Sequence, residues 1–254
     1  VVVGCGLGGT WLINANVALK PEPWVLEDHA WPVEIQQDAR SGRLEDYYER
    51  AGQMLSSTDY PPPGFPALLK QQALERTNAA VGARRPFQRP LVNVTFKEGV
   101  NKFGVHQRAC QLCGDCVSGC NYAAKNTVLM NYLPEAKRHG AELFTETSVR
   151  FVTRESNEWV VRFDRTGSAR PTFSAPPLTV RAPVVVLAAG TLGSTEILLR
   201  SREEGKLSLS ACLGRGFTGN GDVFALAYNG TEPIDGVGAG FRRPDLHHQV
   251  GPCI

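Results

Sequence analysis

The chain has 254 residues, a formal net charge of +2 and 42% hydrophobic residues. This length suffices for one large domain or two small ones with a substantial core. The near balance of charge gives no indication of nucleic-acid binding, and no apolar run reaches the roughly 18 residues of a membrane span. We therefore expect a soluble protein. The sequence shows no signal peptide and indicates no compartment or oligomeric state.

Both ends of the chain suggest that it is incomplete. The β-branched residues Val1–Val3 predict a strand that is already under way, and no Met precedes them. The last residues, Gly251–Ile254, do not resemble a natural stop. We expect the chain to be the central part of a longer protein.

The first half of the chain gives local helix signals and one strand signal. Helix-forming composition occurs at Leu44–Leu55 and at Ala67–Glu75, on either side of the proline-rich joint Pro61–Pro66. A short strand is expected at Leu91–Phe96. We interpret residues 28–125 as inserted material.

The second half is more regular. Helical spacing predicts a helix over Asn126–Gly140, interrupted at Pro134 and ended by Gly140. A strand is expected at Ala141–Glu146. Two alternating runs follow, at residues 149–153 and 159–163, and the polar turn between them predicts a β-hairpin.

An apolar run near residue 186 predicts a strand that is covered on both faces. The run is Pro183–Ala189, and Gly190 ends it. Ser194–Arg202 then has helix-forming composition, up to Gly205. The order of elements predicts a mixed α/β fold with an antiparallel addition.

The start of the chain satisfies the dinucleotide-binding pattern G-x-G-x-x-G through Gly4, Gly6 and Gly9, with Glu27 and Asp28 about 20 residues on. The residues that follow fit a helix poorly, because Asn14 and Asn16 are the main polar side chains and favour turns. We therefore prefer a glycine-rich loop along a large ligand, with asparagine amides as hydrogen-bond donors and acceptors.

Two separate stretches, one at Gly4–Pro21 and one at Ala188–Leu199, carry glycine-rich patterns. These patterns resemble the signatures of the glucose–methanol–choline (GMC) flavoprotein oxidoreductases, nearest to the cholesterol-oxidase-like branch. The first resembles the family through Gly4, Cys5, Leu7, Gly8, Gly9, Thr10, Ile13, Asn14, Ala18 and Pro21. Trp11 departs from it, where the family usually has Ser or Thr. The second signature is matched by Ala188–Leu199, and Leu213–Gly221 also resembles this branch.

The resemblance implies an FAD-binding, Rossmann-like domain with an antiparallel hairpin excursion, followed by the start of a substrate domain. It divides the chain into an FAD-binding loop and strand (1–27), a substrate-side insert (28–125), the FAD-binding core (126–205) and the start of the substrate domain (206–254). The residues expected to bind FAD are Gly4, Gly6, Gly8, Gly9, Thr10, Asn14, Val17, Val149 (whose backbone would hold the adenine) and Gly190.

Four of the seven cysteines form a tight cluster at Cys110, Cys113, Cys116 and Cys120. This is the spacing of a bacterial ferredoxin run, but Asn121 stands where a Pro usually follows. An iron–sulfur cluster would need either Cys120 itself or a remote ligand such as Cys5, Cys212 or Cys253. A zinc site, reduced thiols and a local disulfide are the alternatives. We assign no metal, and we expect His106 to be an ordinary surface histidine.

The implied reaction is oxidation of a CH–OH group in an alcohol or sterol-type substrate, with hydride transfer to flavin N5 and reoxidation by oxygen or another acceptor. The catalytic His and its His or Asn partner are expected beyond Ile254, so we assign no catalytic residue. His247 and His248 are expected to be exposed to solvent. Two alternatives stay open: a nicotinamide-dependent dehydrogenase that uses the first glycine loop, and a metal-binding electron-transfer protein.

Overall fold

Helices dominate the first 80 residues, and the longest strands lie after residue 146. The computed structural model describes residues 6–60, 62–167, 176–219, 221, 228–245, 247 and 249–252. The α-helices are α1 (Pro23–Glu27), α2 (Val33–Arg40), α3 (Arg43–Leu55), α4 (Leu69–Ala80), α5 (Tyr132–Arg138) and α6 (Gly190–Glu203). The 3-10 helices are η1 (Gly9–Leu12), η2 (Cys116–Ser118) and η3 (Val128–Met130). The strands are β1 (Val17–Ala18), β2 (Leu91–Val92), β3 (Gly99–Val100), β4 (His106–Gln107), β5 (Thr147–Glu155), β6 (Glu158–Arg165) and β7 (Leu178–Ala182).

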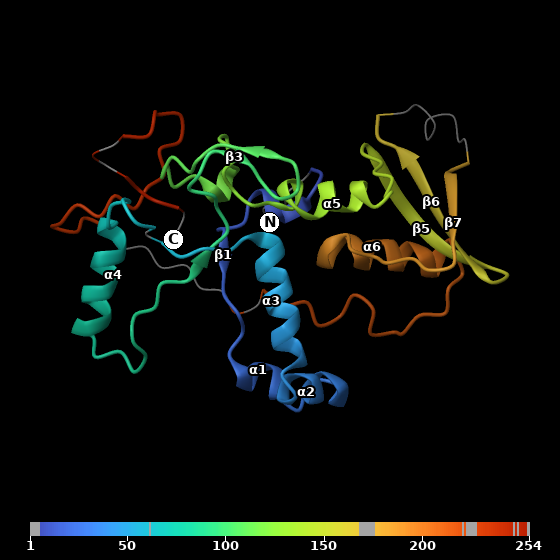
Figure 1. Cartoon of the computed structure of the whole chain (residues 1–254). Coiled ribbons are helices and arrows are strands. Elements are labelled where there is room, and N and C mark those ends of the chain that lie inside the picture. The colour runs from blue at the N-terminus through green and yellow to red at the C-terminus, as the bar shows by residue number, and fades with distance from the viewer. Residues whose placement is uncertain are drawn as a thin grey trace. The chain divides into compact units, whose positions relative to one another are not determined.

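The chain divides into two compact units. The first unit is Val1–Glu142 together with Asn229–Ile254, and the second is Leu143–Tyr228 (Figure 1). The strand expected at Val1–Val3 lies outside the described residues. The division into four functional segments remains a prediction, because compact units alone do not assign a role to each stretch.

Two helices of the first unit were predicted from the sequence of the first half of the chain. The helix expected at Leu44–Leu55 is confirmed as α3, which begins one residue earlier. The helix expected at Ala67–Glu75 is confirmed as α4, which begins at Leu69 and continues to Ala80. Helices α1 and α2 pack against each other, and α2 contacts α3 (Figure 1).

A small apolar core holds the first unit together. Its buried members are Tyr60, Leu68, Val92, Val94 and Leu112. The ring of Phe96 packs against it, with ring centroids 5.0 Å from Phe65 and 5.7 Å from Tyr60. The strand predicted over Leu91–Phe96 is realised as β2, which pairs antiparallel with β1, and as a single bridge from Val94 to Lys125.

The helical prediction for Asn126–Gly140 is confirmed in part, as η3 and α5, but the interruption lies at Asn131 and not at Pro134. Asn131 caps α5, since its Oδ1 accepts the Tyr132 amide at 2.7 Å. Pro134 lies in the first turn, where a missing N–H is tolerated, and Gly140 follows the helix with φ 86°.

The strand predicted at Ala141–Glu146 is wrong. These residues form an exposed loop, with Phe144 73% exposed, and Glu146 has a left-handed φ of 53°. A left-handed residue interrupts an extended run, so regular strand geometry begins only with β5 at Thr147.

The second unit contains a three-stranded antiparallel sheet in the order β5-β6-β7. The predicted hairpin is confirmed as β5 and β6, joined by a turn in which Ser156 has φ 53°. At the turn, the carboxylate of Glu155 accepts hydrogen bonds from Arg162 of β6 at 2.8 Å and from Arg181 of β7 at 2.6 Å. One glutamate therefore bridges all three strands.

Helix α6 packs on β5 through a buried serine (Figure 1). The Ser201 hydroxyl donates to the Ile197 carbonyl at 2.7 Å and accepts the Val152 amide at 2.9 Å. Gly205 permits the close approach after the helix, because a Cβ there would meet Val152 O at 2.6 Å.

The buried strand predicted at Pro183–Ala189 is also wrong. The segment is extended but unpaired among the described residues, and Val184 and Val186 are 73% and 81% exposed. An apolar run becomes a buried strand only where neighbouring strands and helices cover it. The chain contains both helices and strands, so the mixed helix-and-sheet class is confirmed. The strand pairs named in the described ranges are antiparallel, so the Rossmann-like arrangement stays a prediction.

Candidate functional site: a glycine loop and a helix-start cavity

The glycine loop (residues 6–16) forms a tight turn followed by the 3-10 helix η1. The Gly9 amide donates to Gly6 O at 2.9 Å, and the Ile13 amide donates to Thr10 O at 3.0 Å. A dinucleotide fingerprint of the nicotinamide type leads into an α-helix, and none begins here. The local structure therefore favours the loop interpretation. Gly4 and Cys5 lie outside the described residues.

Gly8 and Gly9 have different surroundings. Gly8 has φ 104°, and a Cβ there would lie 2.8 Å from Val128 Cγ2, so the loop packs closely on η3. Gly9 has φ 58° and no atom within 4 Å of the Cβ position, and Thr10 next to it is exposed. One side of the loop is therefore buried against the protein, and the other side is open.

The two asparagines of the loop are held by local contacts. Asn14 Oδ1 accepts the Asn16 amide at 3.1 Å. Asn16 is 1% exposed and adopts a left-handed φ of 71°, and its carbonyl accepts the Asn93 amide at 2.8 Å. Its Oδ1 is buried and has no hydrogen-bond donor among the residues that the structure describes.

Val17 and Val149, the two valines expected near FAD, lie on strands. Val17 belongs to β1 and pairs with Val92. Val149 lies at a register shift near the start of β5, and its carbonyl accepts a hydrogen bond from Arg200 of α6 at 3.3 Å. A register shift opens the regular ladder at this point.

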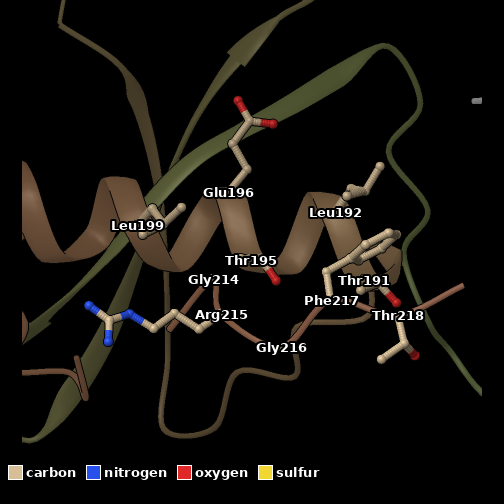
Figure 2. A pocket seen from close by; sticks show the side chains of 10 residues that line it. All are labelled: Thr191, Leu192, Thr195, Glu196, Leu199, Gly214, Arg215, Gly216, Phe217 and Thr218. Atoms are coloured by element: carbon tan, nitrogen blue, oxygen red, sulfur yellow. The ribbon is translucent and has the colours of Figure 1, made fainter. Parts of the chain in front are cut away.

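A cavity of about 560 Å³ lies along the first half of α6. Figure 2 shows the residues that line it, which are Thr191, Leu192, Thr195, Glu196, Leu199, Gly214, Arg215, Gly216, Phe217 and Thr218. The guanidinium of Arg215 and the ring of Phe217 extend toward opposite ends of this cavity (Figure 2). Its size lies within the range of small-molecule sites.

Two segments that the sequence singled out meet in this cavity. One is the helix start after Gly190, where φ is 72° and no atom lies within 4 Å of the Cβ position. The other is the glycine-rich stretch after Leu213, in which Gly214 approaches Thr195 and Leu199 of α6. An exposed helix start carries partial positive charge from its free amides, which favours a phosphate or another anion.

The four clustered cysteines line one small cavity in the first unit. They are free thiols, and burial raises the pKa of Cys110 to about 12 and also raises the pKa of Cys113. Both thiols are therefore protonated and weakly reactive at neutral pH. In the described ranges, no group of three or more His, Cys, Asp or Glu side chains is arranged to hold a metal.

The end of the chain covers the cysteine segment. The Gly251 amide donates to Leu112 O at 2.8 Å, and the Ala239 amide donates to Cys113 O at 2.8 Å. The Asp115 carboxylate accepts the Gly240 amide at 3.0 Å. Cys212 is exposed, whereas Cys253 is not among the described residues.

Comparison with known proteins agrees with these observations. A family model described as GMC oxidoreductase matches residues 1–207. The chain belongs to the GMC oxidoreductase family. Cholesterol oxidases of two Mycobacterium tuberculosis strains (CDC 1551 / Oshkosh and ATCC 25618 / H37Rv) are each 32% identical over 274 residues, covering 100% of this chain and 43% of the relative. A cholesterol oxidase of Acinetobacter baumannii is 30% identical, covering 82% of this chain and 39% of the relative.

Members of the GMC family are FAD-binding oxidoreductases. The chain spans less than half the length of these cholesterol oxidases. Taken by itself, the first unit offers the open backbone at Gly9 and the buried Asn16 Oδ1, which has no donor among the described residues. The second unit, taken by itself, offers the open backbone at Gly190 beside a cavity.

Two of the histidines that the sequence analysis considered lie at exposed positions. His106 is 60% exposed and lies 3.9 Å from Glu98, as expected of a surface histidine. His247 is exposed, and its backbone amide donates to Asp245. His248 is outside the described residues.

No helix in the described ranges is long and apolar enough to cross a membrane.

Sequence reasoning missed Lys125. This lysine is 1% exposed, and its ammonium donates to the carbonyls of Leu12, Asn14 and Cys116 at 3.3, 2.7 and 3.0 Å. The only signal in the sequence is a lysine among small and amide residues, Ala123–Thr127, where an exposed lysine would be the ordinary expectation.

Proposed function

We propose that the protein to which this chain belongs is an FAD-dependent oxidoreductase that oxidises the CH–OH group of an alcohol or sterol-type substrate. The observation that carries the proposal is the cavity shared by the second signature and residues 214–218, within a chain of the GMC family. The names of the relatives favour a sterol as substrate over a small alcohol.

The chain's part in this reaction is to bind and orient FAD. We propose that the open side of the glycine loop lies along the cofactor, with the amides of Gly6, Gly8 and Thr10 as donors and with Gly9 contributing its open backbone. Gly4, Asn14 and Val17 complete this contact surface. The buried Asn16 Oδ1 offers an additional acceptor beside it.

In the second unit, the free amides at the start of α6 attract the negative charge of the FAD diphosphate. Gly190 leaves room for this approach, because no atom occupies the space where a side chain would begin. The backbone of Val149 is proposed to contact the adenine. Bound FAD would supply the redox chemistry, as the acceptor of the hydride from the carbinol carbon, and oxygen or another acceptor would reoxidise it. The hydroxyl proton would pass to a general base, for which no residue of this chain is assigned.

The test uses the protein in its natural full length. Purified protein should show a flavin absorbance spectrum, and anaerobic addition of cholesterol or of a primary alcohol should bleach it. A colourless protein that still oxidises the substrate would refute the proposal. The same experiment with both substrates tells a sterol enzyme from an enzyme of small alcohols.

A variant tests the cavity itself. Thr191→Trp should fill the cavity beside α6 and exclude the cofactor from it. We expect FAD binding to weaken by about tenfold or more, which corresponds to about 1.4 kcal/mol. Glu203→Trp, at the other end of the same helix and exposed, is the matched control. Equal FAD affinity in the two variants would remove the cavity from the FAD site.

A further inference from the structure

We propose that Lys125 is a positioning residue that sets the conformation of the glycine loop for FAD. This inference rests on the proposed function and goes beyond it, because Lys125 is not expected to touch the cofactor. The loop has no regular secondary structure between the end of η1 at Leu12 and the start of β1 at Val17. Its buried carbonyls therefore need partners from elsewhere in the chain.

The ammonium of Lys125 supplies those partners. An ammonium has three N–H donors and no acceptor. Here it donates to Leu12 O at 3.3 Å, Asn14 O at 2.7 Å and Cys116 O at 3.0 Å. Two of these three acceptors belong to the glycine loop, on either side of Ile13. The cation also lies at the carbonyl end of η1, which favours positive charge.

The backbone that carries Lys125 is itself fixed. Thr95 donates its amide to Ala124 O at 2.8 Å, and the Asn126 amide donates to Asn93 O at 2.8 Å. The Asn93 amide in turn donates to Asn16 O at 2.8 Å. The loop therefore has two attachments to the rest of the first unit. The Asn93 amide binds the carbonyl of Asn16, and the Lys125 side chain binds the carbonyls of Leu12 and Asn14.

The same ammonium joins the loop to the cysteine segment. Cys116 offers its carbonyl to Lys125, and its Sγ accepts the Asn16 Nδ2 at 3.8 Å. All of these residues lie in the first unit. A change at Lys125 should therefore alter how the loop presents its amides.

The principal test compares two lysine variants of the full-length protein. Lys125→Met keeps the aliphatic stem and removes the three donors. Lys70→Met is the matched control, because Lys70 also donates to a backbone carbonyl of the first unit, Pro252 O at 3.1 Å. We expect the dissociation constant of FAD to rise about tenfold or more in Lys125→Met, because the loop loses charge-assisted hydrogen bonds that fix its conformation. In Lys70→Met the dissociation constant should stay within about twofold of the wild-type value.

A second readout separates positioning from general stability. Measured well below the melting temperature and at saturating FAD, the visible circular dichroism of the bound flavin should change in Lys125→Met. A lower melting temperature with unchanged flavin affinity and an unchanged flavin spectrum would overturn the inference. If the wild-type protein itself binds no FAD, the proposed function fails instead.

Hydrogen–deuterium exchange on the wild-type protein covers the case in which Lys125→Met does not fold. FAD should slow exchange in residues 12–16 and also in residues 116–125, to which the lysine joins them, and should leave α3 unchanged. Protection confined to residues 12–16 would overturn the inference.

Discussion

The glycine loop of the first unit and the start of α6 in the second unit are held by different means. The loop is fixed by buried polar groups, mainly Lys125 and Asn16, and by the close packing of Gly8 on Val128. The start of α6 has open space around Gly190, and the helix is held further along by Ser201 on β5.

This difference determines how each region should respond to change. A buried polar network loses stability with each partner that is removed, because every further unsatisfied buried group is costly. A helix on an antiparallel sheet distributes its contacts, so a change at its exposed start should remain local. We therefore expect substitutions in the glycine loop to lower stability more than equivalent ones at the start of α6.

The largest effect is expected from matched glycine substitutions. Gly8→Ala should destabilise the protein by about 2–4 kcal/mol, because the new Cβ meets Val128 Cγ2 at 2.8 Å and the residue has φ 104°. Gly190→Ala, with φ 72° and no neighbour within 4 Å, should cost about 1 kcal/mol of left-handed strain. Urea unfolding measures both, and equal losses would contradict the comparison.

A serine substitution tests what holds α6. Ser201→Ala should lower the free energy of unfolding by about 1–3 kcal/mol, because the Val152 amide loses its buried acceptor. Ser208→Ala, at an exposed position in the same unit, should stay within about 0.5 kcal/mol. If the two alanine variants were equally stable, the Ser201 hydrogen bond would not contribute to holding α6 on β5.

The smallest effect concerns the charged bridge across the sheet. A hydrogen bond from Arg181, with the charge of Arg162, lowers the pKa of Glu155 below its ordinary value of 4.5. Its stabilising contribution is therefore present at neutral pH and is lost as the pH falls through the lowered pKa. The melting temperatures of wild type and Glu155→Gln should converge in acid, and Glu203→Gln should show no such convergence. A constant difference between wild type and Glu155→Gln would exclude the ion pairs as its cause.

The sequence predicted those elements whose signals are local. The β5–β6 hairpin follows from alternation and a polar turn, and α5 follows from helical spacing that Gly140 ends. The strands expected at Ala141–Glu146 and Pro183–Ala189 fail because a strand depends on partners that its own residues do not specify.

The site shows the same limit. Both glycine signatures were visible in the sequence, because glycine is needed at their positive φ angles. Lys125 was not, since its role depends on the carbonyls of Leu12 and Asn14, more than 100 positions away along the chain. Whether a lysine is buried is decided by such distant contacts and not by its neighbours in sequence.

The first unit is interrupted in sequence, because residues 143–228 separate its two parts. Gly251 donates to Leu112 across that interval, and a Cβ at Gly251 would lie 2.1 Å from Leu68 Cδ1. During synthesis, the second unit can form as soon as it leaves the ribosome, whereas the first must wait for residue 251. The cysteine segment is thus uncovered on every nascent chain until residues 239–251 have been synthesised.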